Sequence, residues 1–148
     1  MSENLIIGCA TMAFCLAIQC VFVSILLRVL ITMEKKQTIK TTLSGMSFLL
    51  IAVMLTMLAG NLLQITLWAG LFFAYGEFNT YAAAFYHSAV NFTTLGYGDL
   101  VMSEQRRLLG ALEAANGVLM FGLTTGLIFA VLSELTKREW DRRIGSLK

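Results

Sequence analysis

The sequence predicts an all-α membrane protein with three spanning helices and one short re-entrant helix. Composition is the first reason, because 57% of the 148 residues are hydrophobic and only 14% are charged. Soluble domains are nearer half apolar and a quarter charged, so this balance indicates lipid as the solvent. The second reason is three apolar segments, at about 5–31, 45–75 and 108–135. Each exceeds the roughly 20 residues that cross a bilayer core.

The first segment is interpreted as a retained helix and not as a signal peptide. Residues 2–4, which precede it, carry one negative and no positive charge, and the apolar run is longer than a typical signal sequence. Three cysteines lie within it, at Cys9, Cys15 and Cys20. Their spacing is not that of metal ligands, so we expect small packing or lipid-facing residues.

The distribution of basic residues predicts the orientation. Only Arg106 and Arg107 lie between the second and third segments. Arg28 lies near the end of the first segment, and the remaining basic residues lie in a loop at 34–44 or a tail at 136–148: Lys35, Lys36, Lys40, Lys137, Arg138, Arg142, Arg143 and Lys148. By the positive-inside rule, we expect that loop and the C-terminus in the cytoplasm, and the N-terminus outside the cell membrane. We expect the tail near anionic lipid headgroups. The net charge of +2 does not suggest nucleic-acid binding.

Residues 81–92 predict a helix that is too short to span. The stretch is apolar and helix-favouring, and Asn79 or Thr80 is suited to cap its start. About 12 residues reach roughly 18 Å, which fits a re-entrant half-helix surrounded by protein or water. This half-helix leads directly into the run Thr93, Thr94, Leu95, Gly96, Tyr97, Gly98 and Asp99.

This run resembles the selectivity filter of the pore-loop potassium channels. That family's filter reads Thr-Val-Gly-Tyr-Gly, usually followed by Asp, and it lies between a half-helix and an inner helix. The resemblance covers about 45–134 and implies a pore domain over 45–135. The N-terminal helix, at 1–33, lies outside the family's two-helix plan. The implied function is a homotetrameric potassium-selective channel, with K⁺ ions and membrane lipids as partners and no cofactor beyond the bound ions.

The filter chemistry follows from the backbone. The carbonyls of Thr94, Leu95, Gly96 and Tyr97 are expected to replace the water around K⁺, as in other channels of this kind. Gly96 and Gly98 permit the unusual backbone angles that inward carbonyls need. The Thr94 hydroxyl adds the innermost ring, and the Tyr97 ring is expected to point away from the axis and brace the half-helix. One loop supplies one carbonyl per layer, so four chains are needed.

The resemblance also implies residues that support the filter. Tyr86 and His87 occupy positions where relatives often carry an aromatic girdle, and His87 is either a neutral girdle residue or a pH sensor. Asp99 is expected to hydrogen-bond side chains of the half-helix. Val90 stands where some relatives have a Glu that pairs with this Asp. We expect Glu113 to hydrogen-bond the half-helix near Tyr86 or His87 and partly replace that carboxyl group.

The inner helix carries three glycines, at Gly117, Gly122 and Gly126. Gly117 aligns with the family's hinge glycine, and a hinge and close helix packing both remain open there. Packing is favoured for the other two glycines. The same alignment places three side chains toward a central cavity: Val118, Phe121 and Thr125.

Three other functions were weighed against passive potassium conduction. One is a subunit of the potassium-uptake proteins, although those resemble four fused repeats with degenerate filters. Another is a non-conducting or partner-dependent membrane subunit in which the filter serves assembly. An enzyme is not expected, because the sequence offers no nucleophile–base pair and no metal-ligand cluster. A voltage sensor is not expected either, because Arg28 is a single charge.

Overall fold

The structure, a computed structural model, describes residues 1–35 and 43–145, which form four helices. They are α1 (Ser2–Lys35), α2 (Leu43–Ala74), α3 (Tyr81–Phe92) and α4 (Arg107–Gly145). Three stretches are long and apolar enough to cross a membrane: Ser2–Thr32, Gly45–Ala74 and Arg107–Lys137. The predicted spans are therefore confirmed. Lys36, Lys40 and Lys148 lie outside the described residues.

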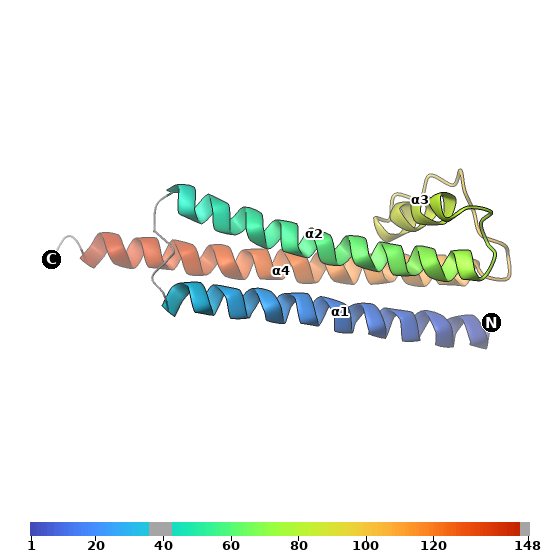
Figure 1. Ribbon diagram of the computed structural model, residues 1–148, viewed down its shortest axis with the longest axis horizontal. Helices are drawn as coiled ribbons and strands as arrows, with labels where there is room; N and C mark the ends of the chain where they lie inside the picture. The colour runs from blue at the N-terminus through green and yellow to red at the C-terminus, as the bar shows by residue number, and fades with distance from the viewer. Residues whose placement is uncertain (36–42, 146–148) are drawn as a thin grey trace.

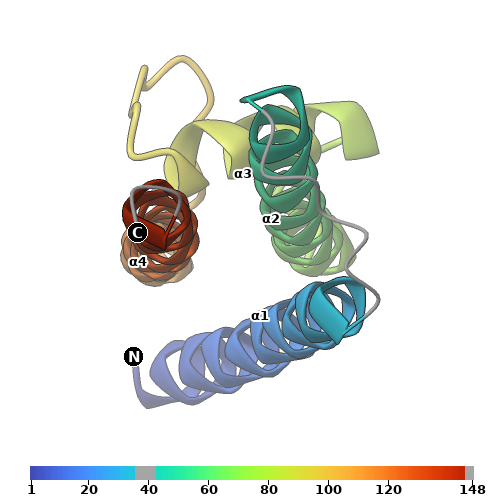
Figure 2. The same ribbon diagram turned by 90° about the vertical axis from the view of Figure 1, so that its left-hand side faces the viewer.

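The three long helices run along a common axis, and α3 lies at one end of them (Figure 1). The N-terminus is at the α3 end, and the C-terminus is at the opposite end. Viewed along the axis, α1 and α3 lie on opposite sides of the pair formed by α2 and α4 (Figure 2). Each of α1 and α3 contacts both members of that pair. The pair α2–α4 is therefore the central layer of the fold.

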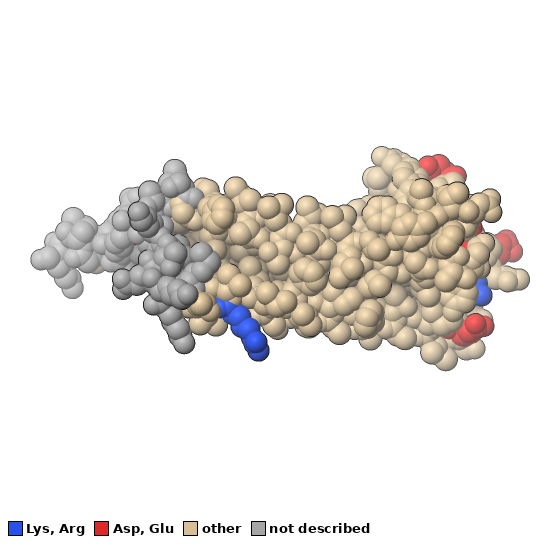
Figure 3. Space-filling view, viewed as in Figure 1, with Lys and Arg blue, Asp and Glu red and all other residues tan. Residues whose placement is uncertain are grey.

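The surface agrees with a lipid environment. In the view of Figure 3, the middle of the molecule is uncharged and the described charged side chains lie near its two ends. Many large apolar side chains are exposed there, including Ile25, Leu55 and Phe129. An apolar band between two polar ends is the surface that a bilayer requires of a spanning protein.

The short helix has the predicted bounds and a defined start. Thr80 is extended, with φ of −135° and ψ of 148°, and its side chain accepts a hydrogen bond from the Ala83 amide at 3.2 Å. A threonine N-cap satisfies one of the amides that a helix start leaves unpaired. At the other end, the Thr93 amide donates to the Ala89 carbonyl at 3.1 Å. Thr80, and not Asn79, is therefore the cap.

Two apolar clusters form the core. The cluster nearer α3 draws on all four helices and includes Cys15, Trp68, Phe72, Phe92 and Met120. The other joins α1, α2 and α4 near the opposite end and includes Leu26, Val53, Met57 and Val131. Cys15 is thus a packing residue, while Cys9 and Cys20 are exposed, in line with their predicted packing or lipid-facing roles.

Gly117 lies where α4 passes closest to the end of α3. A Cβ atom there would lie 1.9 Å from the Phe92 carbonyl oxygen, a backbone atom that cannot turn aside. Close packing of α4 on α3 is therefore confirmed at Gly117, while a hinge there stays a prediction. The packing predicted for Gly122 and Gly126 is not found within the described chain, where a Cβ atom at either would have nothing within 4 Å. Both lie on a face of α4 that the chain's other helices leave uncovered.

The contact at Gly117 predicts a large difference between two alanine substitutions. Gly117→Ala is expected to lower the free energy of unfolding by about 1–3 kcal/mol, because Phe92 must move. Gly122→Ala is the matched control in the same helix, and it is expected to be neutral or to stabilise by up to about 1 kcal/mol. Chemical unfolding in mixed micelles, followed by circular dichroism, measures both. Equal stability of the two variants would contradict the packing described here.

Candidate functional site

Residues 94–98 form an irregular segment between α3 and α4 with an alternating backbone. Thr94, Gly96 and Gly98 have positive φ angles of 59°, 62° and 75°, whereas Leu95 and Tyr97 do not. In a regular β-strand, successive carbonyls point to opposite sides. Alternating left-handed residues turn consecutive carbonyls toward one side instead. The two glycines take this conformation without strain.

Thr94 is the strained member of this segment. It is the one non-glycine residue with positive φ among the described residues. A β-branched residue is rarely found in this region, and holding one there costs about 1–3 kcal/mol. Strain of this size persists only where surrounding contacts enforce it. Here the amides of Thr94 and Leu95 donate to the Asn91 carbonyl at 2.8 Å and the Val90 carbonyl at 2.9 Å, which hold the segment on the end of α3.

The side chains of this segment are not covered by the rest of the chain. Leu95 is 55% exposed and Tyr97 is 66% exposed. Within its own chain the Tyr97 ring is not covered, so the bracing of the filter against the half-helix that is expected of Tyr97 stays a prediction. An open cavity of about 500 Å³ lies beside the segment, and its lining includes Gly96, Gly98 and Val90.

Asp99 and Tyr86 connect the segment to α3. The Tyr86 hydroxyl donates a hydrogen bond to Asp99 Oδ2 at 2.9 Å, which confirms the expected contact of Asp99 with the half-helix. This hydrogen bond is the main reason that the pKa of Tyr86 is raised above its usual value. The bond spans from the middle of α3 to the residue directly after Gly98. It therefore fixes the outer end of the segment relative to the helix.

His87 is a buried ring with both nitrogens in use. Its Nδ1 lies 2.9 Å from the Leu100 carbonyl, and its Nε2 lies 2.8 Å from the Asn91 amide nitrogen. A carbonyl can only accept, so Nδ1 carries the hydrogen and Nε2 accepts from Asn91. Phe72 and Phe78 pack against the ring at centroid distances of 5.7 and 4.8 Å. Burial lowers the pKa of His87, against the opposing effects of the Leu100 carbonyl, Asp99 and Glu77. This environment matches the neutral girdle residue.

Glu113 meets α3 at Ser88. The Ser88 hydroxyl donates to Glu113 Oε1 and also lies 2.9 Å from the Ile65 carbonyl of α2. Both side chains are fully buried. The predicted hydrogen bond from Glu113 to the half-helix, near Tyr86 or His87, is confirmed, and the partner is Ser88, the residue after His87. The helix period turns Ser88 toward α2 and α4, while Tyr86 is exposed.

The proton count around Ser88 suggests the charge state of Glu113. A serine hydroxyl has one hydrogen, and the Ile65 carbonyl can only accept. A protonated Glu113 carboxyl would donate to Ser88 and leave the hydroxyl free to donate to Ile65. Glu113 Oε2 is buried without a hydrogen bond of ordinary geometry, although the Asn91 side chain lies near enough to interact. A neutral carboxyl group at this depth also avoids the high cost of a buried charge.

A cluster that the sequence analysis did not single out closes the outer loop. Glu77 accepts hydrogen bonds from the Ser103 amide at 2.8 Å and the Ser103 hydroxyl at 2.9 Å. Its Oε1 also lies 3.6 Å from Arg106 Nε, and the Arg106 guanidinium lies 3.6 Å from the centroid of the Tyr75 ring. These contacts tie the end of α2 to the start of α4. No local pattern in the sequence pairs Glu77 with residues so far along the chain.

The remaining predicted site residues lie on exposed or partly covered surfaces. Val118 is 57% exposed, and Phe121 is 40% exposed although its ring packs edge-on against Phe92 at 5.8 Å. Thr125 is exposed, and its hydroxyl donates to the Phe121 carbonyl of its own helix. Val90 is buried and apolar. The Thr93 hydroxyl donates to the Ala89 carbonyl at 2.7 Å.

The buried His87 predicts a pH-dependent stability. Since its pKa is lowered in the folded protein, protonation favours the unfolded chain. The melting temperature is expected to be constant above about pH 6.5 and to fall as the pH drops below that ordinary value. His87→Gln keeps one donor and one acceptor and removes the titration. Thermal unfolding of both proteins between pH 7.5 and 5 measures this, and an identical pH profile would contradict it.

The Ser88 contact predicts different effects for two substitutions of Glu113. Glu113→Ala leaves a cavity and a half-satisfied Ser88, and is expected to lower the free energy of unfolding by about 1–3 kcal/mol. Glu113→Gln keeps a donor and is expected to retain most of the stability. Glu104→Ala removes an exposed carboxylate and serves as the control. Chemical unfolding in mixed micelles ranks the three, and a Glu113→Ala protein as stable as the control would refute the role of the contact.

The comparison with known families agrees with this site. Residues 60–134, about half of the chain, match the family described as "Ion channel". The match runs from the middle of α2 through α3 and the segment 94–98 to Glu134 of α4. No curated protein and no solved structure matches the chain. The chain is therefore an integral membrane protein of the pore-loop ion channel family, and not an enzyme.

Proposed function

We propose that four copies of this chain form a channel selective for K⁺, with residues 94–98 as its filter. The observation that carries the proposal is the alternating backbone of this segment, with positive φ at Thr94, Gly96 and Gly98. Membership of the ion channel family supports conduction, and the backbone pattern supports K⁺ as the conducted ion. A hydrated K⁺ ion loses its water only where closely spaced oxygens replace it.

The proposed ion sites are layers of backbone oxygens. Carbonyls of Thr94, Leu95, Gly96 and Tyr97 form four layers, and the Thr94 hydroxyl adds the innermost ring. Leu95 takes a position where the family usually has Val, but its side chain does not coordinate the ion. The replacement therefore changes the packing behind the filter and leaves the carbonyl in place. Conduction follows when ions in neighbouring layers repel one another.

The inner end of the filter is proposed to open into a water-filled cavity. Val118, Phe121 and Thr125 line it, on the face of α4 that the rest of the chain leaves exposed. The last turn of α3 ends at the Thr93 cap, directly before the filter. A helix C-terminus carries a partial negative charge of about half an elementary charge. Four such ends favour a cation in the cavity.

Assembly accounts for the surfaces that one chain leaves open. Leu95 and Tyr97 are exposed beside a cavity of about 500 Å³, although both belong to the filter segment. A fourfold homo-oligomer places the same surfaces of each copy around one axis. In that assembly, the Tyr97 ring points away from the axis and braces α3 of a neighbouring copy. Phe121 and Val118 then face the cavity and not lipid.

The proposed membrane is the cell membrane, with the filter's outer mouth and the N-terminus outside. The filter segment and the N-terminus lie at the same end of the molecule (Figure 1). Lys137 is the last residue of the third span, and in the sequence it is followed by further basic residues. Positive residues remain on the cytoplasmic side during insertion, which supports a cytoplasmic C-terminus. Gating in this arrangement comes from the filter, the α4 bundle, lipid or a partner.

Flux from liposomes tests the proposed function. The purified protein is reconstituted, and the uptake of K⁺ and of Na⁺ is measured with and without barium. Barium-sensitive flux that strongly favours K⁺ is expected, because barium has the size of K⁺ and twice its charge. Gly98→Ala is expected to abolish the flux, since alanine is strained at a φ of 75°.

Gly70→Ala is the matched control, because a Cβ atom there meets nothing within 4 Å. It is expected to conduct as the wild type does. Equal uptake of K⁺ and Na⁺ would refute the proposed filter. No uptake from a confirmed tetramer would refute conduction by this chain alone and favour a subunit that needs a partner.

A further inference from the structure

A chain of buried amides holds α1 against the central pair of helices. Gln19 of α1, Gln64 of α2 and Asn116 of α4 are each fully buried. Gln64 Nε2 donates to Gln19 Oε1 at 2.9 Å, and Asn116 Nδ2 donates to Gln64 Oε1 at 3.2 Å. Gln19 Nε2 also lies 3.5 Å from Met57 Sδ. Three membrane-spanning helices are therefore joined at one level by polar side chains.

The amide chain lies directly beside the Ser88 contact. Ile65, whose carbonyl accepts from Ser88, follows Gln64 along α2. Glu113, which bonds the same hydroxyl, is one helical turn before Asn116 on α4. Two neighbouring layers of polar contacts therefore use the same stretches of α2 and α4. One layer joins them to α1, and the other joins them to α3.

The absence of a side chain at Gly60 of α2 leaves room for the Gln19 amide. A Cβ atom at Gly60 would lie 2.8 Å from Gln19 Oε1, so a larger residue there would displace the amide. A buried amide in an apolar span is costly unless it is hydrogen-bonded. Here both ends of the Gln64 amide are bonded, to Gln19 and to Asn116, while Asn116 Oδ1 accepts no hydrogen bond of ordinary geometry. Lipid-facing positions of α1 carry apolar residues, as at Val21 and Ile25. Gln19 is thus placed for a contact and not for solubility.

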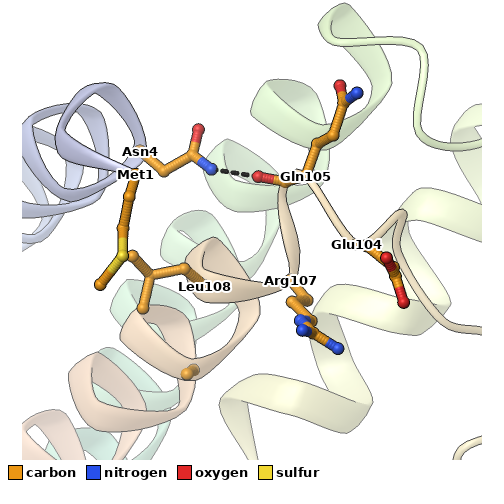
Figure 4. Close-up of a pocket in the computed structure, with 7 residues that line it drawn as sticks. Met1, Asn4, Glu104, Gln105, Arg107 and Leu108 are labelled. Carbon is orange, nitrogen blue, oxygen red and sulfur yellow. Dashed lines mark hydrogen bonds between the residues drawn. The ribbon is translucent and has the colours of Figure 1, made fainter.

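A second polar contact fixes the outer end of α1. The Asn4 side chain donates to the Gln105 carbonyl, in the loop between the filter segment and α4 (Figure 4). Close by, a Cβ atom at Gly8 would lie 2.3 Å from Leu112 Cδ1 of α4. The helix α1 therefore contacts α4 closely over the half that faces the filter end. Asn4 lies in the first turn of α1, and Gln19 lies at its middle.

We propose that α1 braces the filter and that Gln19 is the positioning residue of this brace. Gln19 Oε1 accepts from Gln64 Nε2 and so orients the Gln64 amide with its Oε1 toward Asn116. The Gln64–Asn116 bond then keeps α2 and α4 at the separation that lets Ser88 bond both. The position of α3, and with it the start of the filter segment, then depends on a helix that never touches it. The inference rests on the proposed function for its effect on conduction, but its structural part does not.

Two variants of Gln19 and one control test the brace in the full-length protein. Gln19→Leu has a similar volume and removes the hydrogen bonds. Gln19→Glu keeps the Oε1 acceptor for Gln64 and serves as the conservative rescue. Cys20→Ala changes the next residue of α1, which is exposed, and serves as the matched control. Amide hydrogen exchange, read by mass spectrometry, and single-channel recording in planar bilayers measure the outcome.

Gln19→Leu is expected to speed exchange in residues 81–102 about three- to tenfold, the ratio that one interhelical hydrogen bond in a membrane represents. Exchange in residues 45–53, which lie before the Met57 contact of Gln19, is expected to stay unchanged. The open probability is expected to fall by a similar factor at unchanged unitary conductance, because the carbonyl ligands themselves are intact. Gln19→Glu and Cys20→Ala are expected to behave as the wild type.

The outcomes separate the brace from the channel. If the wild type passes no K⁺ but Gln19→Leu still exchanges faster than the wild type in residues 81–102, the proposed function is refuted and the brace is kept. Unchanged exchange and gating in a conducting Gln19→Leu channel would refute the brace. Faster exchange spread equally over all helices, or failure of Gln19→Glu to restore the protection, would also refute it. Either result would reduce Gln19 to an ordinary packing residue.

Discussion

The position of the half-helix depends on one hydroxyl group. Ser88 lies between the Ile65 carbonyl of α2 and the Glu113 carboxyl of α4, and the side chains of Ser88 and Glu113 are fully buried. The segment that follows α3 takes its position from this helix, and it includes the strained Thr94 and the two left-handed glycines. Glu113 of α4 brings a carboxyl group to the half-helix, while Val90 is apolar. That Glu113 partly replaces the carboxyl group that some relatives carry on the half-helix stays a prediction.

The elements could be predicted because their signals are local. The length of the apolar runs predicted the three spans, and a threonine before an apolar run predicted the start of α3. The backbone of the filter segment followed from its two glycines, but the strain at Thr94 did not, because a threonine gives no sign of positive φ. Ser88 and Gln19 were missed because small or amide side chains occur in many helices. Only the packing of helices that are distant in the sequence shows which of these side chains form hydrogen bonds. The expectation for Tyr97 stays a prediction, because a single chain leaves the ring exposed and cannot show what covers it in an assembly.

The outer end is held by a different kind of contact from the buried layers. Glu77, Ser103 and Arg106 form charged and polar contacts that remain partly open to water, where each is worth little by itself. The His87 contact with Leu100 lies inside them and is shielded by two phenylalanine rings. The loop after the filter is thereby fixed from three directions, by α1, α2 and α3. Such a loop keeps its shape through many weak contacts and does not depend on one strong one.

The close approach at Gly117 divides α4 into two mechanically different parts. Before it, α4 touches the Phe92 carbonyl and carries Glu113 and Asn116, so any displacement there would break directed bonds and push on the backbone of α3. Beyond it, Val131 and Leu135 meet α1 and α2 in an apolar cluster. Apolar contacts are non-directional, so they set no preferred register of their own. The part of α4 nearest the filter segment is thus tied to α2 and α3 by directed contacts, and the part remote from it is held by apolar packing.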